Sequence, residues 1–171
     1  VFQAWNTADN LRCGSRFLAA SRHDLIFHAA GFYGLKWDHR HGGLATGFTP
    51  DSIERGLERR RALLALNPNV VLLMEIRYRD AHRSFLPEGH EWWRRDEEGE
   101  LVMGWEEGGF IQLDFSNPDY RQHVARRAEA AVESGVVDGE VLDWWRDDPD
   151  HISLMKAVRE RVGEDALILA N

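Results

Sequence analysis

The sequence predicts an α/β fold, namely about five parallel strands and four helices of a partial (β/α)8 barrel, truncated at the C-terminus. Short apolar runs alternate with amphipathic segments along the 171 residues, which is typical of strand–helix–strand units with parallel strands. The units recur at the spacing of a barrel whose usual length is about 250 residues. Neither a Gly-x-Gly-x-x-Gly segment after the first strand nor a Gly-Lys-Ser/Thr segment occurs, which disfavours nucleotide-binding α/β folds.

The expected strands are short and mostly apolar throughout, as in strands that are buried on both faces. They cover residues 1–6, 24–31, 70–78, 137–145 and 166–171. Because the chain begins without Met and ends on the fifth strand, we expect residues 1–171 to be one incomplete catalytic barrel domain. We expect such a fragment to be poorly soluble or inactive by itself, since it leaves a strand edge unpaired.

Four helices are expected, at residues 10–22, 50–66 and 118–134 and from a start within 146–153 to a stop at Gly163. Thr49 is the expected N-cap of the second helix, and Pro50 suits its first position. Gly135 and Gly163 are typical helix ends. Residues 79–117, rich in Trp, Gly and charge, are expected to form a long functional loop.

Composition excludes several classes of function. Lys and Arg number 21 against 29 Asp and Glu, a net charge of −8, which argues against a nucleic-acid partner. No apolar run approaches the ~18 residues of a membrane span. The single cysteine, Cys13, excludes an internal disulfide and a Cys-rich zinc site, and we expect it to be a small buried residue. No cofactor is expected, and oligomeric state and localisation stay open.

Polar and aromatic residues gather at the C-terminal ends of the expected strands, where parallel α/β folds bind their ligands. The strand starts, at Leu25, Val70 and Leu167, are apolar instead. The strand ends carry Trp5, Asn6, His28, Glu75, Arg77, Tyr78, Asp143, Trp144, Trp145 and Asn171. This asymmetry places the predicted active site at the strand ends.

Two carboxylates stand out among these residues. An unpaired carboxylate at the position of Asp143 would be costly, so we expect it to be functional or paired; as alternatives, it caps the following loop or pairs with Arg146. Glu75 and Arg77 share one side of their strand by its period of two. An Arg favours the ionised form of a neighbouring carboxylate, although a purely structural ion pair is an equal alternative.

The aromatic and histidine residues suggest two kinds of site. Most of the seven Trp residues fall at strand ends or in long loops, where flat rings suit the apolar faces of sugars; as an alternative, some plug the top of the barrel. A metal would need three or four converging ligands, and the spacing of the loop histidines does not supply them: His39, His41, His82 and His90. No metal is therefore placed in the predicted site.

Several separated segments resemble a known group of proteins. HDLIFHAAGFYGLKW, NPNVVLLMEIRYRDA, the stretch from HEWWRRDEEGE to LDFSNPDYR, and VDGEVLDWWRDD are similar to the hypothetical glycosyl-hydrolase-like group of bacterial (β/α)8 proteins. Wider sugar-cleaving barrels share a Leu-Asp-Phe-x-Asn-Pro stretch, as in residues 113–118, and a fourth strand of the form Asp-Gly-x-x-x-Asp, as in residues 138–143.

This resemblance implies a glycosidase in which Asp143, the last Asp of the fourth strand, is the nucleophile. Such families often have an Arg two residues earlier, where this chain has Val141, so Arg77 would supply the charge from the adjacent strand. The resemblance also implies that the general acid comes from a later strand, at or beyond Asn171.

The first hypothesis is therefore a hydrolase of O-glycosidic bonds with a carboxylate pair about 5–5.5 Å apart for retention or about 6.5–9.5 Å apart for inversion. Asp143 is the expected nucleophile and Glu75 an acid/base or positioning group. The carbohydrate substrate would be lined by Trp5, His28, Arg77, Trp144, Trp145 and Asn171. The alternatives are a non-catalytic carbohydrate-binding relative and a metal-dependent hydrolase that uses the histidines.

Overall fold

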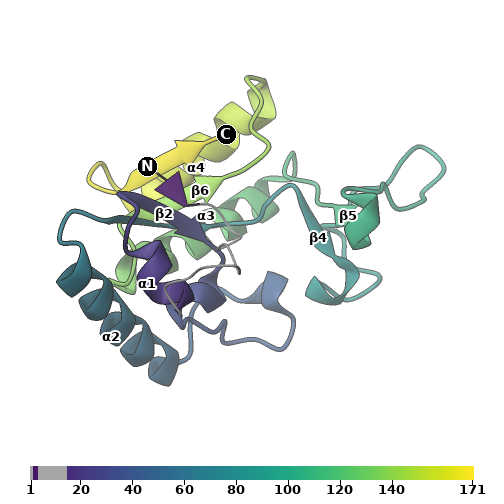
Figure 1. Cartoon of the computed structure of the whole chain (residues 1–171). Helices are drawn as coiled ribbons and strands as arrows, with labels where there is room; N and C mark the ends of the chain where they lie inside the picture. The colour runs from purple at the N-terminus through teal and green to yellow at the C-terminus, as the bar shows by residue number, and fades with distance from the viewer. Residues whose placement is uncertain (1, 4–14) are drawn as a thin grey trace.

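A computed structural model of the chain describes residues 2–3 and 15–171, and its main feature is a parallel sheet (Figure 1). Each strand of this sheet pairs with the next along the chain, as in a barrel, whereas a doubly wound sheet reverses its strand order. All five strands lie within the predicted ranges, which confirms them. They are β1 (Phe2–Gln3), β2 (Leu25–His28), β3 (Val71–Glu75), β6 (Gly139–Leu142) and β7 (Leu167–Ala170).

Four α-helices alternate with these strands: α1 (Arg16–Ala20), α2 (Pro50–Leu66), α3 (Pro118–Glu133) and α4 (Pro149–Val162). The three longer helices begin at a proline, because the missing N–H is not needed in the first turn. Asn117 and Asp148 cap α3 and α4 by accepting backbone hydrogen bonds. Thr49 does stand at the N-cap of α2, but its side chain makes no cap hydrogen bond. None of the described helices is long and apolar enough to cross a membrane.

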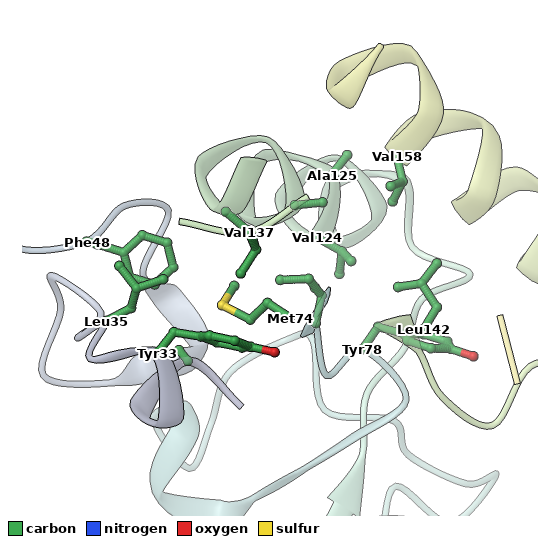
Figure 2. Packing of buried hydrophobic residues seen from close by; sticks show 14 of the residues in the cluster. Tyr33, Leu35, Phe48, Met74, Tyr78, Val124, Ala125, Val137, Leu142 and Val158 are labelled. Carbon is green, nitrogen blue, oxygen red and sulfur yellow. The ribbon is translucent and has the colours of Figure 1, made fainter. Parts of the chain in front are cut away.

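The two faces of the sheet differ in what covers them. On one face, Met74 and Leu142 pack in the main hydrophobic core with helix residues such as Val124 (Figure 2). On the other face, Phe27 and Leu73 belong to a separate cluster made of strand residues alone. A barrel carries its helices outside and strand side chains inside. The chain therefore forms part of a (β/α)8 barrel, and the second face corresponds to the barrel interior.

The start of β6 is fixed by the Asp-Gly pair of the fourth-strand motif. Asp138 Oδ2 accepts a 2.8 Å hydrogen bond from the backbone N–H of Leu72, and Asp138 Oδ1 pairs with Arg60. A Cβ at Gly139 would lie 1.9 Å from the carbonyl oxygen of Leu167, so only glycine allows β7 to approach β6 here. Both motif residues at the strand start thus have structural roles.

The segment between β3 and α3 is not the open loop that the sequence predicted. β4 (Asp80–His82) and β5 (Phe110–Gln112) pair antiparallel, and further bridges join residues 95 with 101 and 103 with 111. We call residues 80–113 the hairpin module, which projects from the main sheet (Figure 1). It also contains the 3-10 helices η3 (Arg83–Phe85) and η4 (Glu106–Gly108); η1 (Ala30–Tyr33) and η2 (Gly42–Leu44) follow β2.

Candidate active site

Three polar side chains from different strands end on the same face of the sheet. Glu75, Asp143 and Asn171 each follow, two residues later, a strand residue of the interior cluster. Side chains along a strand alternate between its faces, so all three lie on the interior face at the C-terminal edge. A parallel α/β barrel binds its ligand at this edge.

A cavity of about 420 Å³ opens at this edge, within the ~300–1,000 Å³ typical of ligand sites. It brings together four of the predicted site residues, Glu75, Arg77, Asp143 and Trp144. The other lining residues come from the end of β3 and from the hairpin module: Ile76, Tyr78, Arg79, Asp80 and Trp105. A second cavity of about 820 Å³ shares Arg79 and Trp144 with it.

Asp143 is half-buried, and its bonding is incomplete. Oδ1 accepts a 2.8 Å hydrogen bond from Nδ2 of Asn171. In the described part of the chain it forms no ion pair with Arg146, one of the alternatives that the sequence left open, and Oδ2 has no hydrogen-bonding partner. One carboxylate oxygen is therefore held in place and the other remains free.

Arg77 is turned mainly toward Asp80 rather than toward Glu75. Its Nε lies 2.9 Å from Asp80 Oδ1, whereas its Nη1 lies 3.9 Å from Glu75 Oε1. Asp80 is almost fully buried, so its charge requires this close partner. Within the described residues Arg77 makes no ion pair with Asp143. The geometry thus gives Arg77 a structural task in addition to its contact with Glu75.

Trp144 presents its ring to the cavity from a strained backbone. Among the described residues it is the one non-glycine residue with a positive φ, 61°, which costs about 1–3 kcal/mol. The Tyr78 hydroxyl donates to its carbonyl at 3.2 Å, and the next amide, of Trp145, donates to the carbonyl of Asn171. The residue is 58% exposed, and Arg79 Cζ lies 4.3 Å from the centroid of its ring.

Tyr78 itself is held as a hydrogen-bond donor. Burial, and then the negative charge of nearby Asp143, raise the pKa of Tyr78 well above its ordinary value. The phenol therefore stays protonated and is a poor candidate for a general base. Its backbone carbonyl accepts from the hydroxyl of buried Tyr120 at 3.1 Å, which fixes the chain at the exit of β3.

Among the described residues, the predicted site residues His28, Trp145 and Asn171 do not line the cavity. His28 pairs in register with Met74, whose side chain lies in the helix-covered core, and its ring stacks on Phe32 at 4.5 Å. Trp145 is half-buried against the core, with its ring 5.1 Å from that of His151. Trp5 and Cys13 lie outside the described residues, as does Asn6. Asn171 contacts Asp143 without lining the cavity.

The contribution of the hairpin module to the cavity was not predicted from the sequence. Asp80 and Trp105 line the cavity although 29 residues of chain, 76–104, separate Trp105 from Glu75. The exposure of Trp105, 50% for the whole residue, has no counterpart in any local sequence pattern. The clustering of Trp in residues 79–117 was the available signal, and it did not single out this residue.

The histidines considered for a metal serve local structure. His39 Nδ1 accepts from the backbone N–H of His41, whose own Nδ1 contacts the Ser84 carbonyl. His82 and His90 also bond within their own turns. In residues 2–3 and 15–171 no group of three His, Cys, Asp or Glu side chains is arranged to hold a metal ion.

Comparison with solved structures shows what the fold is similar to. The chain resembles a noncanonic maltogenic alpha-amylase from Thermotoga neapolitana, with a TM-score of 0.62 and 18% identity over 99% of this chain and 44% of that one. An alpha-amylase from Lactobacillus plantarum gives 0.60 and 16%, over 99% and 44% of the two chains. An alpha-galactosidase from Thermus thermophilus in complex with stachyose gives 0.59 and 19%, over 99% and 39%.

The chain thus spans less than half the length of each of these structures. No family model matches the sequence, and no curated protein matches it. At such low identity the likeness concerns the fold. The chain has the fold of part of a (β/α)8 barrel, with its polar strand ends and its cavity at the edge where that fold binds ligands.

Proposed function

We propose that the protein is a glycoside hydrolase that cleaves O-glycosidic bonds at the C-terminal edge of its barrel. One observation carries the proposal: two carboxylates from neighbouring strands, Glu75 and Asp143, line a single cavity together with the exposed ring of Trp144. Glycosidases use a carboxylate pair, and an aromatic ring supports the apolar face of a sugar. The glycosidase-type fold agrees with this function.

In this proposal Asp143 is the nucleophile. Its free Oδ2 attacks the anomeric carbon while Asn171 holds Oδ1 in position. The bond from the anomeric carbon to the leaving oxygen breaks as a general acid protonates that oxygen, and water later hydrolyses the glycosyl-enzyme with net retention. Glu75 is our candidate for the acid/base within this chain; the resemblance in sequence would instead assign that role to a later strand.

Some of the other predicted residues have a proposed contact with the substrate, and others have none. Trp144 stacks on the sugar ring, and Trp5 stays a predicted subsite residue. No substrate contact is proposed for His28 or Trp145, because one lies on the helix-covered side and the other packs against the core.

The nucleophile is tested by substituting Asp143→Asn in the full-length protein. The alpha-amylases and the alpha-galactosidase among the similar structures suggest 4-nitrophenyl α-glucoside, 4-nitrophenyl α-galactoside and maltotriose as substrates. We expect kcat/KM to fall at least about 10³-fold. Asp147→Asn is the matched control, since Asp147 is exposed in the same loop, and it should be neutral. Unchanged hydrolysis by Asp143→Asn would contradict the proposal.

The role of Glu75 is tested by its dependence on the leaving group. If Glu75 protonates the leaving oxygen, Glu75→Gln should impair cleavage of maltotriose far more than cleavage of a 2,4-dinitrophenyl glycoside, whose leaving group needs little protonation. Equal losses on both substrates would assign Glu75 to positioning instead. Sugar binding by the wild type without any turnover would identify a non-catalytic carbohydrate-binding protein.

A further inference from the structure

The hairpin module brings a second exposed tryptophan to the cavity. Trp105 is half exposed and lines the same cavity as Glu75 and Asp143. Large apolar rings that face solvent inside a cavity are a common sign of ligand contact. Trp144 lines this cavity as well, so two indole rings from separate segments adjoin one carboxylate pair.

The backbone of Trp105 is fixed from below by a buried carboxylate. Its N–H donates to Asp80 Oδ2 at 3.1 Å, while Asp80 Oδ1 accepts from Arg77 Nε at 2.9 Å. The preceding residue is Gly104, where a Cβ would lie 2.6 Å from Asp80 Cβ and Oδ2. The chain therefore packs directly on Asp80, and the Arg77–Asp80 pair connects the end of β3 to the base of Trp105.

Phe110 fixes the ring of Trp105 from the side. The two ring centroids lie 5.3 Å apart at an interplanar angle of 30°, and the Phe110 N–H donates to the Trp105 carbonyl at 3.0 Å. The guanidinium of Arg77 lies over the ring of Phe110, with Cζ 4.1 Å from its centroid. A ring held in this way loses little conformational entropy when a ligand binds.

We propose that Trp105 is a sugar-stacking platform for a second sugar unit, next to the unit whose bond is cleaved, and that Arg77 and Asp80 are positioning residues for it. This inference rests on the proposed glycosidase function. An indole face covers about one pyranose ring, so two rings at one cavity suit an oligosaccharide better than a monosaccharide. The hairpin module would then determine selectivity for chain length.

Trp105→Ala tests the platform in the full-length protein with two pairs of substrates. For stachyose and maltotriose, KM should rise about tenfold. For the single-sugar 4-nitrophenyl α-galactoside and α-glucoside, it should change less than about twofold. Trp105→Phe should restore most of the oligosaccharide KM. Met103→Ala is the control, because Met103 is exposed on the same module but does not line the cavity. An equal rise for both substrate classes, or no rise, overturns the inference.

Asp80→Asn tests the positioning role, since it removes one acceptor from the contact with Arg77 and Trp105. We expect the rise in KM to be larger for the oligosaccharides than for the aryl glycosides, and no additional rise in the double variant with Trp105→Ala. Additive effects would contradict positioning. If Asp80→Asn does not fold, Arg77→Lys can be used instead, because it weakens the Arg77–Asp80 contact and keeps the positive charge.

Binding measured without turnover separates this inference from the proposed function. Titration of Asp143→Asn, which should not hydrolyse them, with stachyose and maltotriose should quench tryptophan fluorescence, and the quenching should be much smaller when Trp105→Phe is added. Quenching that depends on Trp105 in a protein that hydrolyses no glycoside supports the platform and contradicts the glycosidase. Hydrolysis with quenching that is independent of Trp105 supports the glycosidase and overturns the platform.

Discussion

Asp138 and Asp143 lie at opposite ends of β6, and the structure bonds them very differently. At the start of the strand, Asp138 has both oxygens engaged, by the N–H of Leu72 and by Arg60. At the end, Asp143 has one oxygen held by Asn171 and lines a cavity. The fourth-strand motif contains both residues, so the motif alone does not separate a carboxylate that is bonded into the fold from one that lines a cavity, whereas their bonding does.

Glu140 lies between them and represents a third case. It is fully buried, pairs in register with Met74 and Ile168, and has no hydrogen-bonding partner for either oxygen within the described residues. Burial raises the pKa of Glu140 to about 7, and Arg159 opposes this rise only in part. Within residues 138–143, one carboxylate thus has both oxygens bonded, one is buried without a hydrogen bond, and one lines the cavity with a single hydrogen bond.

The largest expected difference between these three carboxylates is that Glu140 makes the free energy of unfolding depend on pH. The ordinary carboxyl pKa is 4.5, and in the folded state it is about 7. Between these two values, the folded state keeps a carboxyl proton that the unfolded state has lost. The contribution of Glu140 to stability is therefore complete below pH 4.5 and is lost as pH rises through 7. The free energy of unfolding should fall by about 3 kcal/mol over this range.

Glu140→Gln should remove this component, as measured by urea unfolding at pH 4.5 and pH 8. Glu160→Gln, on the exposed surface of α4, is the matched control and should follow the wild type. If Glu140→Gln showed the wild-type pH dependence, the buried Glu140 carboxyl would not be the source of that dependence, and the distinction between the three carboxylates would be contradicted.

A smaller effect is expected from Asp138→Asn. This change removes the half-buried ion pair with Arg60, so the free energy of unfolding should fall by about 1–2 kcal/mol. Because Asp138 lies at the strand end opposite the cavity, kcat should be unchanged below the unfolding temperature. Asp143→Asn should do the reverse, with stability within about 0.5 kcal/mol of wild type. If the Asp138→Asn variant were as stable as the wild type but had a lower kcat, the structural role of Asp138 would be contradicted.

The smallest effect is expected from Asn171→Ala. It removes the hydrogen bond that orients Asp143 Oδ1 and leaves the carboxylate in place. Since Asn171 is exposed and water can replace its amide, kcat/KM should fall about fivefold to tenfold. Initial rates on 4-nitrophenyl α-glycosides test this, with Asn171→Gln as a partial rescue. A loss as large as that of Asp143→Asn would mean that Asn171 has a direct part in the reaction.

The fold was largely predictable because its signals are local. Apolar runs marked all five strands, and the prolines at residues 50, 118 and 149 begin the three longer helices. The hairpin module was not predictable in this way. Its strands have three residues each, too few to show a period, and they are stabilised by pairing across a long insertion rather than by their own pattern.

The site was predictable only in part, for a related reason. Strand ends gave Glu75, Arg77, Asp143 and Trp144, all of which line the cavity. The sequence could not show that His28 faces the helices, because the face depends on register with Met74. Nor could it show that Arg77 mainly contacts Asp80, since both Glu75 and Asp80 are near Arg77 in sequence and only the geometry separates a 2.9 Å contact from one of 3.9 Å.

The central claim is that Asp143 is the catalytic nucleophile, and covalent trapping tests it most directly. The full-length protein would be incubated with a fluorinated glycosyl fluoride of the sugar that it hydrolyses, which slows breakdown of the glycosyl-enzyme. Mass spectrometry of its peptides should then locate the sugar on Asp143. A label on Glu75 or another carboxylate, or hydrolysis with inversion and no covalent species, would contradict the account.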